Sequence, residues 1–167
     1  GLAPNRSMEM LYYNADWLKE LRAAGKIDFD GPPATPDQFK AAACAATSSP
    51  FSKATVSGAP IGYELAVDAS RFASFTFAFG GDVYDSTTNR YTLDSDAAIA
   101  AMTWLQGMFA DGCAKMVSEA YGDQTDFGNG RLLFAVSSSS GLPFYQEATK
   151  SGAGFDWSVA AIPHTTP

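Results

Sequence analysis

Residues 132–143 read LLFAVSSSSGLP, an apolar run that passes directly into serines, a glycine and a proline. The apolar part, Leu132–Val136, is short and predicts a buried strand. Proline is favoured in the first turn of a helix, so a helix is expected over Leu142–Lys150. Hydroxyls and free backbone N–H groups at a helix start can hold phosphate, carboxylate or polyol oxygens. The same serines could instead be helix caps without a ligand, and the sequence alone leaves both interpretations open.

The flanking sequence repeats this pattern of short apolar segments followed by capped helices. The other predicted strands are Met8–Tyr13, Ile61–Ala66 and Trp157–Ile162. The helices are expected to follow capping residues, namely Asn14, Thr35, Asp68 or Ser70, Asp94 or Ser95, and Gly141. Strands alternating with helices predict an α/β fold in which one layered sheet is flanked by helices.

Two of the predicted helices carry more detailed expectations. The second should run over Pro36–Thr47, because Thr35-Pro36-Asp37-Gln38 forms a capping box. The longest should run over Asp96–Asp111, and its expected core face consists of Ile99, Met102, Leu105 and Phe109. A further helix is expected to end over Asp126–Gly130.

Composition excludes several kinds of partner. The chain has 167 residues, with 18 acidic and 11 basic side chains, and a formal net charge of −7. A nucleic-acid backbone or an anionic membrane surface would repel it at long range. No apolar run approaches the roughly 20 residues that a transmembrane helix needs. These features predict a soluble chain that does not bind nucleic acid.

The residues that enzymes commonly use are sparse. His164 is the only histidine, so a Ser-His-Asp triad would depend on it. The chain lacks GxSxG, HExxH and GxxxxGK[ST] motifs, and its two cysteines have no metal-ligand spacing. Asp123 and Asp126 could serve an extracellular glycan-cleaving enzyme, but so close a pair is more typical of a solvated helix start. We expect no catalytic residues, metal or cofactor, and retain the glycan-cleaving enzyme and a non-catalytic interaction domain as alternatives.

The order of motifs along the whole chain resembles the extracellular solute-binding proteins, family 1, of bacterial ABC importers, which include maltose-binding and glycerol-3-phosphate-binding proteins. The segments that carry the resemblance are LYYNADWLKEL, PPATPDQFKAAA, FAFGGDVYD, YTLDSDAAIAAMTWLQGMFADG, DFGNGRLLFAV and FDWSVAAIPH. The resemblance implies one lobe of a type II periplasmic-binding-protein-like fold over residues 1–167, with the other lobe and the C-terminal part absent.

By this resemblance, the chain captures a small polar solute in an interlobe cleft and delivers it to permease subunits in the membrane. The solute would be a sugar, a polyol or a glycerol-3-phosphate-like molecule. The implied location is extracytoplasmic, either periplasmic or anchored at the cell surface as a lipoprotein.

The family pattern also implies which residues line the cleft. They lie before the first strand, after the second strand and in the serine run, and they are Asn5, Arg6, Ser7, Asp68, Ser70, Arg71, Ser137, Ser138, Ser139, Ser140 and Gly141. The serine run matches the glycerol-3-phosphate-binding relatives better than the maltose-binding ones. No tryptophan occurs near Ser70 or Ser140, so the aromatic platform typical of sugar sites is missing there, and we expect a small solute.

The two cysteines can either pair or lie buried as separate small apolar residues. Cys44 and Cys113 lie near the ends of the second and the longest predicted helices. Because the implied family is exported, we expect these two residues to be close enough for a disulfide.

Overall fold

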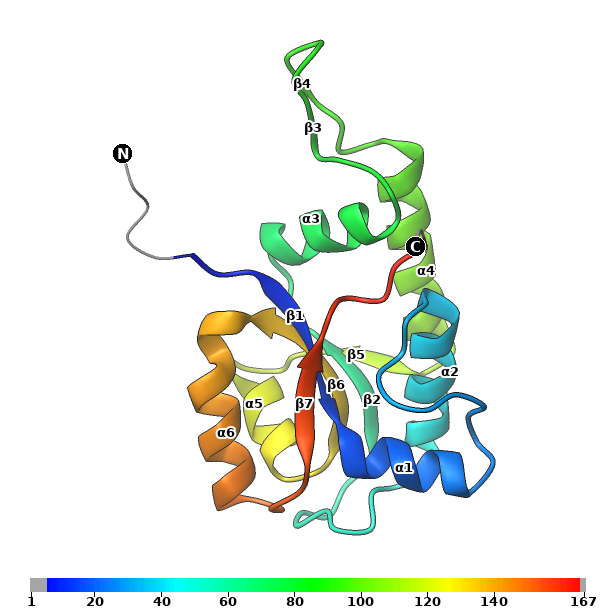
Figure 1. The fold of residues 1–167 in the computed structure, drawn as a ribbon, viewed down its shortest axis with the longest axis vertical. Helices are drawn as coiled ribbons and strands as arrows, with labels where there is room; N and C mark the ends of the chain where they lie inside the picture. The colour runs from blue at the N-terminus through cyan, green and yellow to red at the C-terminus, as the bar shows by residue number, and fades with distance from the viewer. Residues whose placement is uncertain (1–5, 166–167) are drawn as a thin grey trace.

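The computed structural model describes residues 6–165, and a five-stranded mixed sheet lies at their centre (Figure 1). The strand order is β5-β2-β6-β1-β7. The strands are β1 (Glu9–Asn14), β2 (Ile61–Leu65), β5 (Ala114–Met116), β6 (Leu132–Ser138) and β7 (Trp157–Ala160). All four predicted strands therefore share one sheet, which confirms the expected α/β class with helices flanking a layered sheet.

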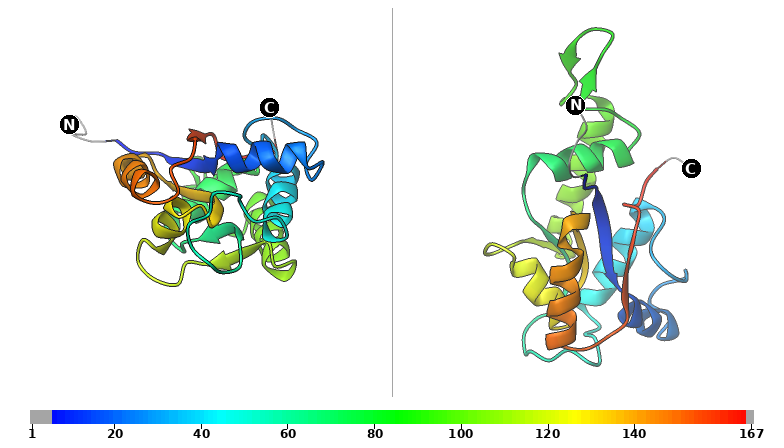
Figure 2. Two further views of the ribbon diagram at one scale, coloured as in Figure 1. Left: turned by 90° about the horizontal axis from the view of Figure 1, so that it is seen from below. Right: turned by 60° about the vertical axis from the view of Figure 1, so that its left-hand side comes forward.

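The helices form two layers around this sheet. They are α1 (Ala15–Ala23), α2 (Pro36–Thr47), α3 (Ala69–Ala78), α4 (Asp96–Ala110), α5 (Gly122–Gly128) and α6 (Leu142–Ser151). The views in Figures 1 and 2 place α5 and α6 on one face of the sheet and α1, α2 and α4 on the other. Helix α3 lies across one edge of the sheet, and the hairpin β3 (Tyr84–Asp85) and β4 (Arg90–Tyr91) projects beyond it.

Strand directions decide which segments meet at that edge. Strand β2 is parallel to β5 and β6, whereas β1 is antiparallel to both β6 and β7. The carboxyl ends of β2, β5, β6 and β7 therefore lie at the same edge as the start of β1. We call this the carboxyl edge, and it comprises residues 6–8, 66–71 and 137–141.

Most of the predicted caps are observed. The side chains of Asn14, Thr35, Asp68 and Ser95 each accept a hydrogen bond from a backbone N–H in the first helical turn. Asp68, rather than Ser70, caps α3, so Ser70 lies within the first turn of that helix. Gly141 precedes α6 without a side-chain cap, as a glycine must.

One sequence expectation was wrong in detail, and one strand was not predicted. Ile99 is 56% exposed, because α4 buries the smaller Ala98 and Ala101 together with Leu105 and Met108. Helix α5 ends at Gly128, inside the Asp126–Gly130 segment where the sequence predicted a helix end. Strand β5 was not predicted, because Ala114–Met116 contains only three residues, too few for its alternation of apolar and polar residues to indicate a strand.

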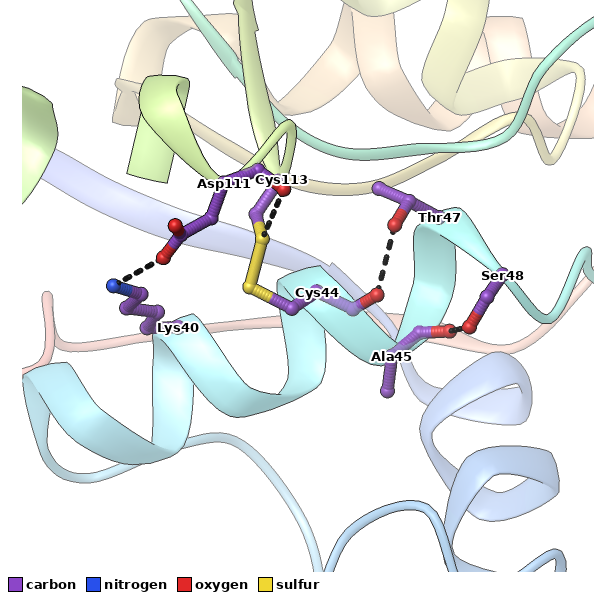
Figure 3. The surroundings of a disulfide bond; sticks show 7 residues. All are labelled: Lys40, Cys44, Ala45, Thr47, Ser48, Asp111 and Cys113. Carbon is purple, nitrogen blue, oxygen red and sulfur yellow. Dashed lines mark hydrogen bonds and ion pairs between the residues drawn. A yellow bond between two sulfur atoms is a disulfide. The ribbon is translucent and has the colours of Figure 1, made fainter. Parts of the chain in front are cut away.

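A disulfide joins Cys44 of α2 to Cys113, which precedes β5 (Figure 3). Their Cα atoms are 4.5 Å apart, which confirms that the two residues are close. Beside the disulfide, Lys40 of α2 forms an ion pair with Asp111 at 2.7 Å. Gly62 of β2 lies directly beneath, where a Cβ would come within 2.2 Å of the Ala43 carbonyl oxygen. The disulfide therefore fixes α2 against the edge of the sheet at a place where only glycine fits.

A buried carboxylate lies on the α5 face of the sheet. The Glu64 side chain is 2% exposed, and its Oε1 forms an ion pair with Lys115 Nζ at 3.0 Å. Asp126 of α5 lies 3.9 Å from the same Nζ and accepts hydrogen bonds from Arg131 at 2.5 to 2.9 Å. Burial raises the pKa of Glu64 to about 7, Lys115 opposes the rise, and Asp126 adds to it.

Reduction of the disulfide should destabilise the chain. The bond closes a loop with a sequence separation of 69 residues, and the entropy lost by the unfolded chain is worth about 4 kcal/mol. We expect the urea midpoint of the oxidised protein to fall when dithiothreitol is added. The double variant Cys44→Ala/Cys113→Ala is the control, and its midpoint should not respond to reductant. Equal midpoints for the oxidised and reduced protein would contradict a stabilising disulfide.

The substitution Glu64→Gln should change how stability depends on pH. The pKa of Glu64 is higher in the folded chain than in the unfolded chain, so ionisation costs folding free energy as pH rises from about 4.5 to 7. The Glu64→Gln variant lacks this cost, and its free energy of unfolding relative to the wild type should rise by roughly 2–3 kcal/mol between pH 5 and pH 8. Urea unfolding at both pH values measures this change.

The matched control for that measurement is Asp94→Asn, which removes an exposed carboxylate. Its stability relative to the wild type should be the same at pH 5 and pH 8. Parallel pH profiles for Glu64→Gln and the wild type would show that the Glu64 carboxyl titrates normally.

Candidate binding site at the carboxyl edge

Arg71 is the centre of the carboxyl edge. Its Nε donates to the Val136 carbonyl oxygen at 2.8 Å, and its Nη2 donates to Ser137 Oγ at 3.4 Å. Its Nη1 forms an ion pair with Asp68, one turn earlier in the chain. The arginine side chain is only 13% exposed. Arg71 therefore ties the start of α3 to the end of β6, and Asp68 balances its charge within the site.

The serine run is ordered by its own hydrogen bonds and by the start of β1. Ser138 Oγ accepts from the Ser140 backbone N–H at 3.2 Å and lies 2.9 Å from Ser140 Oγ. Ser139 pairs with Met8, because its N–H donates to the Met8 carbonyl oxygen at 2.8 Å and its Oγ accepts from the Met8 N–H at 3.3 Å. The Ser138 hydroxyl thus acts as a local cap and the Ser139 hydroxyl binds the start of β1, whereas Ser140 is exposed at the surface.

Two tyrosines that the sequence analysis did not single out support the serine run from below. Tyr12 of β1 donates to the Ser138 carbonyl oxygen at 2.7 Å, and its ring stacks on that of Tyr145 at 4.1 Å. Tyr145 of α6 donates to Asp123 at 2.7 Å. Burial, with the nearby Glu9 charge, raises the pKa of Tyr12 to about 12, and burial also raises the pKa of Tyr145. Both phenols are therefore neutral hydrogen-bond donors at physiological pH.

The predicted cleft residues are distributed unevenly over this edge. Arg71 is bonded to both Asp68 and Ser137, and Ser138 is bonded to Ser140. Ser139 lies between them in the serine run and is bonded to Met8. Ser70 is exposed in the first turn of α3, and Arg6 and Ser7 are exposed before β1. Asn5 lies outside the described residues.

Gly141 occupies a packed position rather than an open one. It is buried, and a Cβ there would lie 3.4 to 3.5 Å from the Tyr145 ring and the Tyr12 hydroxyl. A Cβ at this position would make ordinary van der Waals contact with the two tyrosines. The sequence pattern of a glycine before a helix could not distinguish such packing from contact with a ligand.

A small hollow of about 130 Å³ opens beside the arginine, between α3 and α4. The polar part of its wall comes from Asp68 and Arg71, and the apolar part includes Val67, Phe72 and Met102. Val67 is 70% exposed, so the hollow is open at the surface. The carboxyl edge thus offers hydroxyls and a charge-balanced guanidinium next to an apolar wall.

The carboxylates that could have served glycan cleavage have internal partners. Asp123 is buried and accepts from Tyr145, and Asp126 is paired with Arg131 and Lys115. His164 Nδ1 lies 3.2 Å from the Ile162 carbonyl oxygen, in the segment that follows β7. Over residues 6–165, no three histidine, cysteine, aspartate or glutamate side chains come together in a metal-binding group. Nor is any helix in the described part of the chain long and apolar enough to cross a membrane.

Comparison with solved structures shows the same fold. The GacH receptor of Streptomyces glaucescens, solved without ligand and with acarbose and an acarbose homologue, is 24% identical with a TM-score of 0.70, over 95% of this chain and 38% of its own. UgpB from Mycobacterium tuberculosis, bound to glycerophosphocholine, is 24% identical with a TM-score of 0.68, over 94% of this chain and 36% of its own. A solute-binding protein from Thermotoga lettingae, bound to α-D-tagatose, is 19% identical with a TM-score of 0.70, over 96% and 40%.

This chain thus spans less than half the length of each of these proteins. No curated protein sequence matches it. The family model described as bacterial extracellular solute-binding protein matches residues 1–167, the full length of the sequence. The chain therefore belongs to the bacterial extracellular solute-binding protein family.

Proposed function

We propose that this chain is one lobe of the substrate-binding component of an ABC importer, and that it captures a small polar solute at the carboxyl edge. The observation that carries the proposal is the meeting of Arg71, Asp68 and the serine run at the ends of neighbouring strands. Ligands of open α/β sheets bind outside the carboxyl ends of the strands. The second lobe, by closing over this edge, supplies the remaining contacts and excludes water.

The geometry favours a neutral, hydroxyl-bearing solute such as a sugar or polyol over a glycerol-3-phosphate-like anion. Three of the five N–H donors of Arg71 are already engaged within the chain, and Asp68 neutralises its charge. An added phosphate would compete with Asp68 for the guanidinium. A sugar hydroxyl can accept from a remaining Arg71 N–H and exchange hydrogen bonds with Ser140 and Ser70 without bringing a charge.

The disulfide supports an extracytoplasmic location, because disulfides persist mainly in oxidising compartments. We accordingly place the protein in the periplasm or, as a lipoprotein, at the cell surface. Its proposed partners are the solute and the permease subunits in the membrane.

A single lobe should bind its solute weakly, since it lacks the contacts of the second lobe. A loss of about 4 kcal/mol weakens binding roughly a thousandfold. Binding by the 167-residue chain is therefore expected in the millimolar range, where chemical-shift changes in ¹⁵N NMR spectra can measure it. Maltotriose, sorbitol and glycerol 3-phosphate are suitable probes of the three solute classes.

We predict that maltotriose and sorbitol shift the Arg71 Nε–H signal and the amide signals of residues 138–141. Ser140→Ala should weaken this binding about fivefold, because one hydrogen bond is worth on the order of 1 kcal/mol. Ser151→Ala at the far end of α6 is the control and should leave the titration unchanged. Shifts with glycerol 3-phosphate alone would refute a neutral solute, and no shift at the carboxyl edge with any probe would refute the site.

A further inference from the structure

Two exposed aromatic side chains face a common hollow beside the serine run. Tyr121 is 73% exposed and Phe144 is 62% exposed. Together with Gln124 they line a hollow of about 300 Å³. Burial of a large aromatic side chain normally stabilises the folded protein, and neighbouring aromatic side chains that stay exposed often mark a binding surface. We call these three residues the aromatic hollow.

The aromatic hollow lies next to the proposed site because of the strand directions. Tyr121 immediately precedes α5, which follows β5, and Phe144 is in the first turn of α6, which follows β6. Strands β5 and β6 both run parallel to β2, so both helices start at the carboxyl edge. Phe144 follows Ser140 by four residues, across the end of a 3₁₀ turn (Ser139–Gly141) and the start of α6.

Buried contacts fix the two helix starts relative to each other. Tyr145, the neighbour of Phe144, donates a buried hydrogen bond to Asp123, two residues after Tyr121. Further along, Gly128 of α5 packs so closely on α6 that a Cβ would lie 2.6 Å from the Ala148 backbone. The relative position of the two aromatic residues is therefore set by the fold before any ligand arrives.

The backbone of Tyr121 adds a second, independent sign of function. Its φ is 62°, in the left-handed region that a bulky residue seldom adopts. Glycine or asparagine would fit this backbone with less strain, yet a tyrosine stands here with its ring exposed. Residues held in such conformations cluster at binding sites, because the surrounding structure must support them.

We propose that the aromatic hollow binds a pyranose ring of a saccharide whose neighbouring unit occupies the serine run. This inference rests on the proposed function. A pyranose has an apolar C–H face that can lie against Phe144 or Tyr121, and hydroxyls at its rim that can bond the Gln124 amide. Among residues 6–165, those that line the hollow include no carboxylate, lysine or arginine, which does not favour a phosphate. A linear polyol has no rigid face to stack, so the hollow selects for rings.

This inference changes the expected size of the ligand. The sequence lacks a tryptophan near Ser70 or Ser140, which pointed to a small solute without an aromatic platform. The structure supplies aromatic rings from residues that are 23 positions apart, Tyr121 and Phe144. The proposed ligand, with one ring in the aromatic hollow and its neighbouring unit at the serine run, contains at least two sugar units.

Ring signals of the 167-residue chain can test this directly by ¹H–¹³C aromatic NMR. Maltotriose should shift the ring signals of Tyr121 and Phe144 together with the amide signals of residues 138–141. Sorbitol, which has hydroxyls but no ring, should shift the amide signals and leave the aromatic signals in place. Phe144→Ala should weaken maltotriose binding five- to tenfold and leave sorbitol binding unchanged, and Phe144→Trp should restore it. Tyr91→Ala, which removes an exposed tyrosine from the distant hairpin, is the matched control and should have no effect.

The possible results separate this inference from the proposed function. If maltotriose shifts the serine-run amides but neither aromatic ring, the aromatic hollow is not a sugar subsite while the proposed function stands. If glycerophosphocholine shifts the rings and maltotriose does not, the hollow holds a quaternary ammonium group and the saccharide inference is wrong. If no probe shifts either set of signals, both proposals fail. Retained far-UV circular dichroism in each variant shows that the substitutions leave the fold intact.

Discussion

The pairing of β6 with β2 on one side and β1 on the other determines what meets at the carboxyl edge. Because β2 and β6 are parallel, the segments that follow them, containing Asp68 and the serine run, leave the sheet side by side. Because β1 is antiparallel to β6, its start returns to the same edge and places Met8 against Ser139. Arg71 can bridge α3 and β6 only in this arrangement. The site is thus a consequence of strand direction, and a change of register would separate its members.

The opposite end of the sheet provides the rigidity that the site requires. The disulfide attaches α2 to the start of β5, the shortest strand of the sheet, and Gly62 allows β2 to pass closely beneath. Strand β5 leads into α5, and α5 packs on α6 through Gly128 and Gly152. The covalent link therefore constrains the strand that leads to Tyr121. The disulfide, although it lies far from the carboxyl edge, thus helps to position the side chains at that edge.

The sequence patterns that predicted the fold depend on local physics. Caps such as Asn14 and Asp68 and the apolar run Leu132–Val136 reflect nearest-neighbour effects, and they located the main strands and helices. Strand β5 was missed because three residues form a strand only where a neighbour is available to pair. Ile99 was assigned to the core because it is large and apolar, whereas the close approach of α4 to its neighbours selects the smaller Ala98 and Ala101. Which residues a helix buries depends on the elements that pack against it, and the periodicity of that helix alone does not give this information.

The site illustrates the same division between local and long-range information. The pair of Asp68 and Arg71 is three residues apart, so the sequence could indicate that both belong to one helix start. Arg71 also donates hydrogen bonds to Val136 and Ser137, which follow it by 65 and 66 residues. The sequence could not predict these long-range bonds. This difference bears on chemistry, because a free guanidinium attracts anions while a partnered one orders the backbone around it. The chain has a net charge of −7, so it repels an anionic ligand at long range. A neutral ligand does not experience this repulsion. The net charge of the chain and the pairing of Arg71 with Asp68 therefore both support the proposal of an uncharged solute.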